Sequence, residues 1–209
     1  MGAVHVDLFI TLDGVVQAPG GPDEDPESGF EFGGWQAPML DEVTGNQVWE
    51  GMARLDALLL GRRTYDIFAS YWPTATVDGP IAELFNRIPK YVASRTAPTL
   101  EWAGSELLGD DLAGEVRRIR DLHDEVHVIG SADLLQSLLA HDLVDRLNLW
   151  LYPITLGTGK RAFAGGTIPA TFRLVEPPIA GSSGAVLLRY ECTHGVPGTG
   201  DMAAPDRGV

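Results

Sequence analysis

The feature that most constrains the fold of this chain is a repeated unit, in which a short strand-like run ends in a turn and a helical pattern follows. Apolar residues 58–60 stop at Gly61, and the run 126–129 stops at Gly130. Tyr91 to Ser94 is a third strand-like run, which ends at a polar residue before Arg95. Short apolar runs bounded by glycine are typical of strands covered on both faces. Strands that alternate with helices predict an α/β fold with a mostly parallel central sheet.

The other elements follow from hydrophobic spacing. Strand patterns cover Val4 to Thr11, Arg146 to Ile154, Phe172 to Val175 and Ala185 to Cys192, and helical patterns cover Met39 to Leu55, Tyr65 to Ser70, Pro80 to Arg87, 112–122 and 134–139. The turn-rich Gly181 to Gly184 joins the last two strands, which predicts an antiparallel pair at the far edge of the sheet. We expect one domain over residues 1–192. Residues 193–209 are rich in Gly and Pro without apolar periodicity, which predicts a disordered tail.

Charge and composition narrow the class of partner. The chain has 209 residues and a formal net charge of -14, which argues against nucleic acid or an anionic membrane as its partner. The single cysteine, Cys192, excludes an internal disulfide and fits a reducing compartment. No run reaches the about 18 apolar residues of a membrane span, and residues 1–10 lack the features of a signal peptide. We therefore expect a cytoplasmic protein that binds a small molecule.

Cations and hydroxyls follow three of the predicted strands at the points where they end. They are Arg62, Arg63 and Thr64 after the first strand, Ser94 and Arg95 after the second, and Gly130 and Ser131 after the third. The carboxyl ends of parallel strands share one edge, where helix N-termini favour anions. The pattern therefore predicts a nucleotide-type crevice, with Ser131 as a helix N-cap. Against this, Asp133 in the first turn of that helix would repel a phosphate, and adjacent arginines also occur in solvated turns.

Two further motifs lack residues that their chemistry needs. Gly157 to Lys160 is similar to the end of a phosphate loop, but Ile154 replaces the first glycine and Arg161 replaces the Ser or Thr. We interpret it as a structural loop. His123 and His127 are four residues apart but straddle a predicted helix end and strand start, so we predict no metal site.

A long loop separates the first strand from the first helix. It runs from Gln17 to Trp35, is rich in Gly, Pro, Asp and Glu, and carries Phe30 and Phe32. A loop of this length is either functional or disordered. Its aromatic residues fit a lid that packs on a ligand, and they fit equally a loop that is pinned to the core.

Six segments together carry a resemblance to a known family. They are Thr11 to Gly14, LLLGRRTY at 58–65, KYVASRT at 90–96, VIGSADLLQSLL at 128–139, LVDRLNLW at 143–150 and PITLGTGKRAF at 153–163. In this order the chain resembles the reductase domain that forms the C-terminal half of the bifunctional riboflavin-biosynthesis deaminase-reductase, within the dihydrofolate-reductase-like superfamily. The resemblance extends to about Cys192 without a preceding deaminase domain. It implies a three-layer fold with a mostly parallel mixed sheet, NADPH as cofactor and a homodimer.

The resemblance also implies roles for particular residues. Gly61, Arg62, Arg63 and Thr64 would lie along the cofactor phosphates, Ser94 and Arg95 would meet the ribose with its 2′-phosphate, Gly130, Ser131, Ala132, Asp133 and Leu134 would hold the pyrophosphate, and Thr11, Leu12, Gly14 and Val15 would pass near the nicotinamide. The apolar residues 147 and 149–151 are our candidates for part of a dimer interface.

A proton donor is harder to assign from the residues. We select Asp13 and Asp41, because a carboxylate buried beside the nicotinamide would have a raised pKa and could act as an acid. Asp41 and Glu42 could equally serve only the dipole of the helix that they begin. The leading hypothesis is an NADPH-dependent reductase acting on a small pteridine- or pyrimidine-like heterocycle, or on a carbonyl or imine compound. The alternatives are a catalytically silent NADP(H)-binding sensor or interaction module, and a structural dimer that binds no nucleotide.

Overall fold

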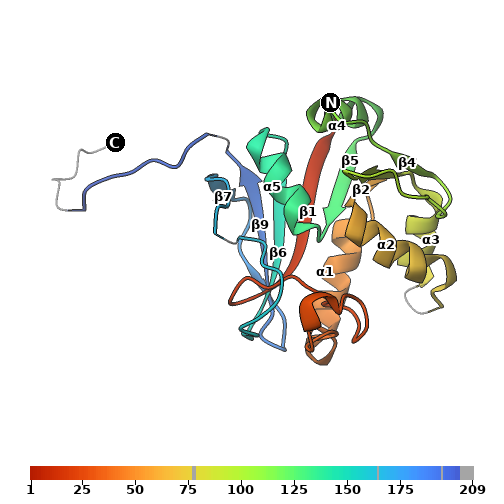
Figure 1. Cartoon of the computed structure of the whole chain (residues 1–209). Helices are drawn as coiled ribbons and strands as arrows, with labels where there is room; N and C mark the ends of the chain where they lie inside the picture. Colours follow the sequence, from red (N-terminus) through yellow and green to blue (C-terminus); the bar gives the residue numbers. More distant parts are fainter. Residues whose placement is uncertain (77–78, 164, 194, 203–209) are drawn as a thin grey trace.

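The computed structural model describes residues 1–76, 79–163, 165–193 and 195–202, and it confirms the α/β class with a central mixed sheet (Figure 1). Within these residues the sheet has nine strands in the order β4-β3-β2-β5-β1-β6-β9-β7, with β8 paired to β9. The strands are β1 Ala3–Thr11, β2 Ala57–Gly61, β3 Lys90–Ala93, β4 Ser105–Leu107, β5 Glu125–Ile129, β6 Arg146–Tyr152, β7 Phe172–Leu174, β8 Ile179–Ala180 and β9 Val186–Cys192. The first six run parallel, and β7, β8 and β6 are antiparallel to β9, as predicted for the far edge.

Helices cover both faces of this sheet. They are α1 Glu42–Met52, α2 Arg62–Tyr71, α3 Gly79–Arg87, α4 Leu112–Leu122 and α5 Ala132–Ala140, with short 3-10 segments at Glu27–Gly29, Ala37–Met39 and Trp72–Thr74. Alternate residues of a strand point to opposite faces, and β2 follows this rule. Leu59 packs with α4 and α5 residues in one cluster, whereas Leu58 and Leu60 pack with residues of α1, α2 and α3 in another. The result is three layers.

β1 lies in the middle of the sheet, between β5 and β6 (Figure 1). Val4, Val6 and Leu8 are completely buried on the face that α4 and α5 cover. Both neighbours run parallel to β1, so the carboxyl ends of all three strands lie at one edge of the sheet. That edge is where α/β proteins bind ligands.

Several predictions about individual elements need correction. The strands β4 and β8 were not predicted, since each has at most three residues and no apolar alternation. The helix predicted from Met39 begins later, at Glu42, because Asp41 caps it by accepting a hydrogen bond from the N–H of Thr44 at 2.7 Å. The suggested dimer strand is β6, which lies inside the sheet and buries Trp150, so that residue is unavailable to a partner.

Two expectations concern the ends of the chain and membranes. The predicted tail, 193–209, falls partly on residues 194 and 203–209, which are outside the described part, so its disorder stays a prediction. Among the described residues, no helix combines the length and the apolar character that a bilayer crossing requires.

Lys90, at the start of β3, has a side chain that is fully buried. Buried lysines need polar partners. Its Nζ donates hydrogen bonds to the carbonyl oxygens of Asn86 at 3.1 Å and Ala103 at 2.9 Å, and lies 4.4 Å from the centroid of the Trp102 ring. Burial lowers the pKa of Lys90 to about 8.

We predict that Lys90→Met removes a pH dependence of stability. The folded-state pKa of about 8 lies below the ordinary value of 10.5, so the unfolded chain holds this proton more tightly. As the pH rises from about 8 to 10.5, the free energy of unfolding of the wild type should therefore increase relative to that of the variant, by at most about 3 kcal/mol. Urea unfolding of both proteins at pH 7 and pH 10 measures the difference. Identical pH dependence in the two proteins would contradict the burial of a charged lysine.

Candidate functional site

A cleft of about 2150 Å³ opens at the carboxyl edge of the parallel strands. It is lined by most of the residues that the sequence predicts to bind a ligand, namely Gly61, Arg62, Arg63, Thr64, Ser94, Arg95, Gly130, Ser131, Ala132, Asp133, Leu134 and Asp41. The turns after β2, β3 and β5 therefore converge on one cavity. Thr11, Leu12, Asp13, Gly14 and Val15 do not line it, whereas the adjacent residues 16–18 do.

Two helices begin at this cleft with their first backbone N–H groups uncapped by side chains. α2 starts after Gly61, and α5 starts after Ser131. Thr64 lies in the first turn of α2, as expected. Uncapped N–H groups and the helix dipole favour a bound anion.

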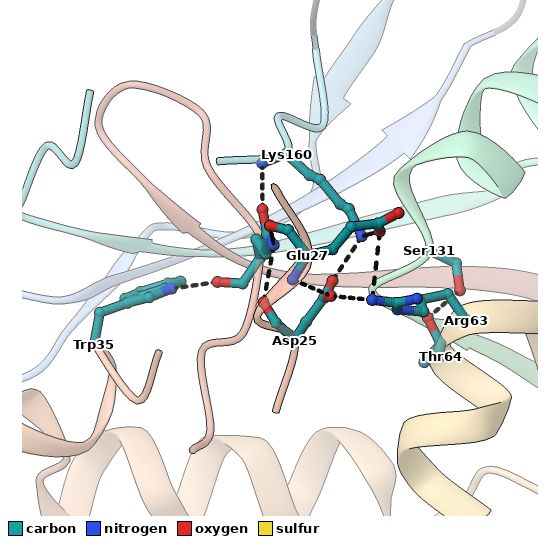
Figure 2. A network of polar contacts seen from close by, with 8 residues as sticks. Asp25, Glu27, Trp35, Arg63, Thr64, Ser131 and Lys160 are labelled. Carbon is teal, nitrogen blue, oxygen red and sulfur yellow. Dashed lines mark hydrogen bonds and ion pairs between the residues drawn. The ribbon is translucent and has the colours of Figure 1, made fainter. Parts of the chain in front are cut away.

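Ser131 does not cap α5 in the way predicted. Its backbone is left-handed, with φ of 56°, and its side chain turns away from the helix. The Ser131 Oγ instead accepts a hydrogen bond from the N–H of Gly61 at 3.1 Å and shares a hydrogen bond of 2.7 Å with Thr64 Oγ1 (Figure 2). This side chain therefore joins the turns after β2 and β5, and it leaves the N–H groups of α5 free.

Among the described residues, four arginines line the cleft and differ in what they contact, and one of them, Arg161, pairs with Asp13 at 3.3 Å. Arg62 forms an ion pair with Asp66 at 2.7 Å, one turn along α2. Arg63 contacts Asp25 at 2.8 Å. Arg95 is exposed, and within the described part of the chain it makes no ion pair. Its guanidinium is therefore free to bind an anionic ligand.

A compact ionic network fixes the long loop against the cleft (Figure 2). The Asp25 carboxylate has 6% of its side chain exposed and contacts Arg63 at 2.8 Å and Lys160 Nζ at 2.7 Å. Glu27 lies 2.5 Å from the same Lys160 nitrogen. Burial alone would raise the pKa of Asp25, but the two cations outweigh it and lower that pKa. The network connects the loop, α2 and the segment after β6.

The aromatic residues of the loop pack mainly on the protein. The Trp35 indole N–H donates to the Gln17 carbonyl oxygen at 2.8 Å (Figure 2). The Trp35 ring meets Tyr152 edge-on, with 5.4 Å between the ring centroids. Phe30 is buried in the same cluster, whereas 45% of Phe32 is exposed. Phe30 and Trp35 therefore pin the loop to the core.

Asp13 is a structural residue of the turn after β1. Its carboxylate accepts hydrogen bonds from the Thr11 hydroxyl at 2.6 Å and from the N–H of Gly157 at 2.8 Å, and it pairs with Arg161 at 3.3 Å. These hydrogen bonds, that of Thr11 first, hold the pKa of Asp13 well below its usual range. Its selection as a proton donor is therefore not supported, because the group stays ionised.

Asp41 lines the cleft but is ionised for a similar reason. It accepts hydrogen bonds from the N–H groups of Thr44 at 2.7 Å and Ser183 at 2.9 Å, which hold its pKa well below the usual range. From the sequence we expect a carboxylate with a raised pKa at the site. In the structure a different residue of the cleft wall, Glu24, has a raised pKa. Burial raises the pKa of Glu24 although it accepts hydrogen bonds from two backbone N–H groups. Sequence reasoning missed Glu24, since nothing distinguishes it from the other acids of the loop.

Comparison with known proteins places this geometry in a family context. The model of the RibD C-terminal domain family matches residues 3–177. The uncharacterized protein YyaP of Bacillus subtilis (strain 168) is 25% identical over 195 residues, which cover 90% of this chain and 93% of YyaP.

Two solved structures share the fold. Dihydrofolate reductase from Enterococcus faecalis, complexed with NADP(H) and RAB-propyl, aligns with a TM-score of 0.57 and 13% identity over 92% of this chain and 98% of its own. A Thermotoga maritima diaminohydroxyphosphoribosylaminopyrimidine deaminase/5-amino-6-(5-phosphoribosylamino)uracil reductase aligns with a TM-score of 0.60 and 16% identity over 91% of this chain and 56% of its own. The dihydrofolate-reductase-like fold expected from the sequence is confirmed.

We predict that Asp25→Asn loosens the long loop. The substitution removes the charge that Arg63 and Lys160 share, and losing charge-assisted hydrogen bonds should lower the free energy of unfolding by roughly 1–3 kcal/mol. Limited proteolysis should then cleave within residues 17–35 faster than in the wild type. Asp23→Asn is the matched control, since Asp23 is exposed and has no ion pair within the described residues. Equal cleavage rates in the two variants would contradict the role of the network.

Proposed function

Since the chain belongs to the RibD C-terminal domain family, we propose that it is a reductase that uses NADPH to reduce a small substrate. The substrate class is a pteridine- or pyrimidine-like heterocycle, or a carbonyl or imine compound. The observation that carries the proposal is the convergence of three strand-end turns on one cleft, together with two uncapped helix N-termini. The dihydrofolate reductase with the same fold was solved with NADP(H).

The donor set of the cleft fits the phosphates of NADPH. Gly130 has a φ of +65°, and a Cβ added there would meet only Thr64 Oγ1, at 3.9 Å, so the backbone is open to a close-lying ligand. Its neighbours at the start of α5 offer free N–H groups, as does the start of α2. Backbone donors of this kind bind a pyrophosphate without bringing side-chain bulk. When bound, NADPH supplies the hydride.

The chain's own residues then bind and orient the cofactor. We assign the pyrophosphate to the N-termini of α2 and α5, and the ribose 2′-phosphate to Ser94 and Arg95. Arg62 adds positive charge at the rim, although Asp66 partly neutralises it. Asp133 is exposed in the first turn of α5, where its charge opposes binding unless the side chain faces solvent. We assign the nicotinamide end of the cofactor to residues 16–18, because these residues line the cleft and Thr11 to Val15 do not.

The charges of the cleft favour a substrate without a phosphate group. The Thermotoga maritima reductase is named for a phosphoribosylamino substrate. In this chain Arg63 and Lys160 are neutralised by Asp25 and Glu27, and Arg161, which also lines the cleft, pairs with Asp13. A substrate phosphate would have to displace these carboxylates. We therefore propose an uncharged heterocycle or imine.

The alternative function is an NADP(H)-binding sensor without turnover. The observation that favours it is the low pKa of both Asp13 and Asp41, which removes them as proton donors. We propose Glu24 in their place, because it lines the cleft and burial raises its pKa above the ordinary value of a carboxyl group. We further propose a homodimer, as the family resemblance implies. We also propose a cytoplasmic location, which fits the single cysteine, the buried Cys192.

We predict that the protein binds NADPH more tightly than NADH and that Arg95→Ala abolishes the preference. Losing one charge-assisted contact to the 2′-phosphate should weaken NADPH about 10- to 100-fold and leave NADH nearly unchanged. Fluorescence titration of both cofactors measures this. Arg117→Ala is the matched control, because Arg117 is an exposed arginine of α4 outside the cleft lining. No binding of either cofactor to the wild type would overturn the proposal.

We predict that Glu24→Gln lowers kcat for NADPH oxidation about 100-fold and leaves the dissociation constant of NADPH unchanged, because the variant cannot donate a proton. The assay uses a panel of unphosphorylated pterins, pyrimidines and cyclic imines. In the wild type kcat should fall as rising pH deprotonates Glu24, and this alkaline limb of the kcat profile should disappear in the variant. If the wild type binds NADPH but oxidises it with no member of the panel, the silent sensor is the better description.

A further inference from the structure

A second polar cluster lies in the first half of β1 and β5, outside the cleft. His5 and His127 are directly in register on these parallel strands, and their rings stack with centroids 4.8 Å apart. Glu125 lies two residues before His127 on β5. One donor atom from each of the three side chains lies within 4.8 Å of the others. None of the three lines the cleft, so the reductase chemistry does not account for them.

His127 is buried with one ring nitrogen unused. Its side chain is 1% exposed, and its Nδ1 lies 2.6 Å from Asp7 Oδ2. The other ring nitrogen, Nε2, is buried without a hydrogen-bond partner, and the nearest carboxylate oxygen, on Glu125, is 3.8 Å away. A buried polar atom without a partner costs stability. The donor atoms of His5 and Glu125 lie within 4.8 Å of this histidine's own donor atom, so all three could contact one shared ion.

The contacts behind His127 are those of a metal-binding histidine. The Asp7 carboxylate is 1% exposed, accepts a hydrogen bond from Asn148 Nδ2 at 2.9 Å, and orients the imidazole through Nδ1. A carboxylate that accepts the Nδ1–H of a histidine leaves the Nε2 lone pair available to a metal ion. Asp7 is therefore a positioning residue, and Asn148 holds it in place.

The neighbouring cationic side chains do not prevent these three residues from binding a metal ion. Arg54 forms an ion pair with Glu125 at 2.5 Å, but 78% of its side chain is exposed, so it can release the carboxylate at little cost. Arg146 is in register with His5 on β6. Two carboxylates, on Asp7 and Glu125, offset these charges.

We propose that His5, Glu125 and His127 bind one divalent transition-metal ion of the zinc type. Two imidazole nitrogens and one carboxylate oxygen are a ligand set that zinc uses, whereas magnesium and calcium prefer oxygen ligands. Zinc bond lengths of about 2.1 Å place tetrahedral ligands about 3.4 Å apart. The His127–Glu125 pair is close to that separation, and small rotations of His5 and Glu125 complete it. The ion links β1 to β5, and water fills its remaining positions.

The test uses the full chain without a histidine tag, stripped of metal by a chelator. Titration with Co²⁺, followed by its visible absorption, should saturate at one ion per chain, and Zn²⁺ should displace it. His5→Ala and Glu125→Gln should each weaken Co²⁺ binding at least 10-fold. Asp7→Asn should weaken it about 10- to 100-fold, because the imidazole loses its orienting carboxylate. His141→Ala is the matched control, since His141 is an exposed histidine at the end of α5, and this variant should bind as the wild type does.

Circular dichroism and thermal unfolding of the metal-free variants establish that they fold. His5 and Glu125 are less buried than His127, so substitutions at these two positions test metal binding even if substitutions at His127 unfold the chain. Bound Zn²⁺ should raise the Tm of the wild type and leave that of His5→Ala unchanged. Absence of saturable Co²⁺ binding, or binding that His5→Ala and Glu125→Gln do not weaken, would overturn the proposal. His127 and Asp7 would then be a buried pair and nothing more.

Discussion

The parallel pairing of β1 with β5 on one side and β6 on the other is the contact on which the rest of the structure depends. A parallel strand in the middle of a sheet is buried on both faces, so helices must cover both. The same pairing places the carboxyl ends of β1, β2 and β5 at one edge, where the turns after β2 and β5 meet through Ser131 and Thr64. The cleft is thus a consequence of strand direction more than of any single side chain.

Electrostatics then decides what this cleft can accept. The chain is strongly acidic, and its own carboxylates neutralise several cations around the cavity, above all Arg63 and Lys160 through Asp25. Arg95 and the N-termini of α2 and α5 keep their positive character. An acidic protein can therefore hold a local anion site without becoming a general binder of phosphate.

Polar groups buried inside the sheet have a separate role. Asp7, His127 and Asn148 form a hydrogen-bonded row across β5, β1 and β6, on the opposite face of β1 from Val4, Val6 and Leu8. Such rows are tolerated in a core only when their members find partners. The unused Nε2 of His127 is the exception in this row, and a metal ion shared with His5 and Glu125 would satisfy it.

The sequence by itself determined the α/β class, most of the long strands and helices, and the identity of the turns that line the cleft. It could do so because the spacing of apolar residues and the glycines at strand ends are local signals. Only the tertiary structure decided which charges remain available. Arg63 meets Asp25, Asp13 meets Arg161, and His5 meets His127 across 38, 148 and 122 positions of the sequence, respectively. Such pairings, and the cations that among the described residues meet Asp25 but not the neighbouring Glu24, depend on how distant segments pack, which no local pattern encodes.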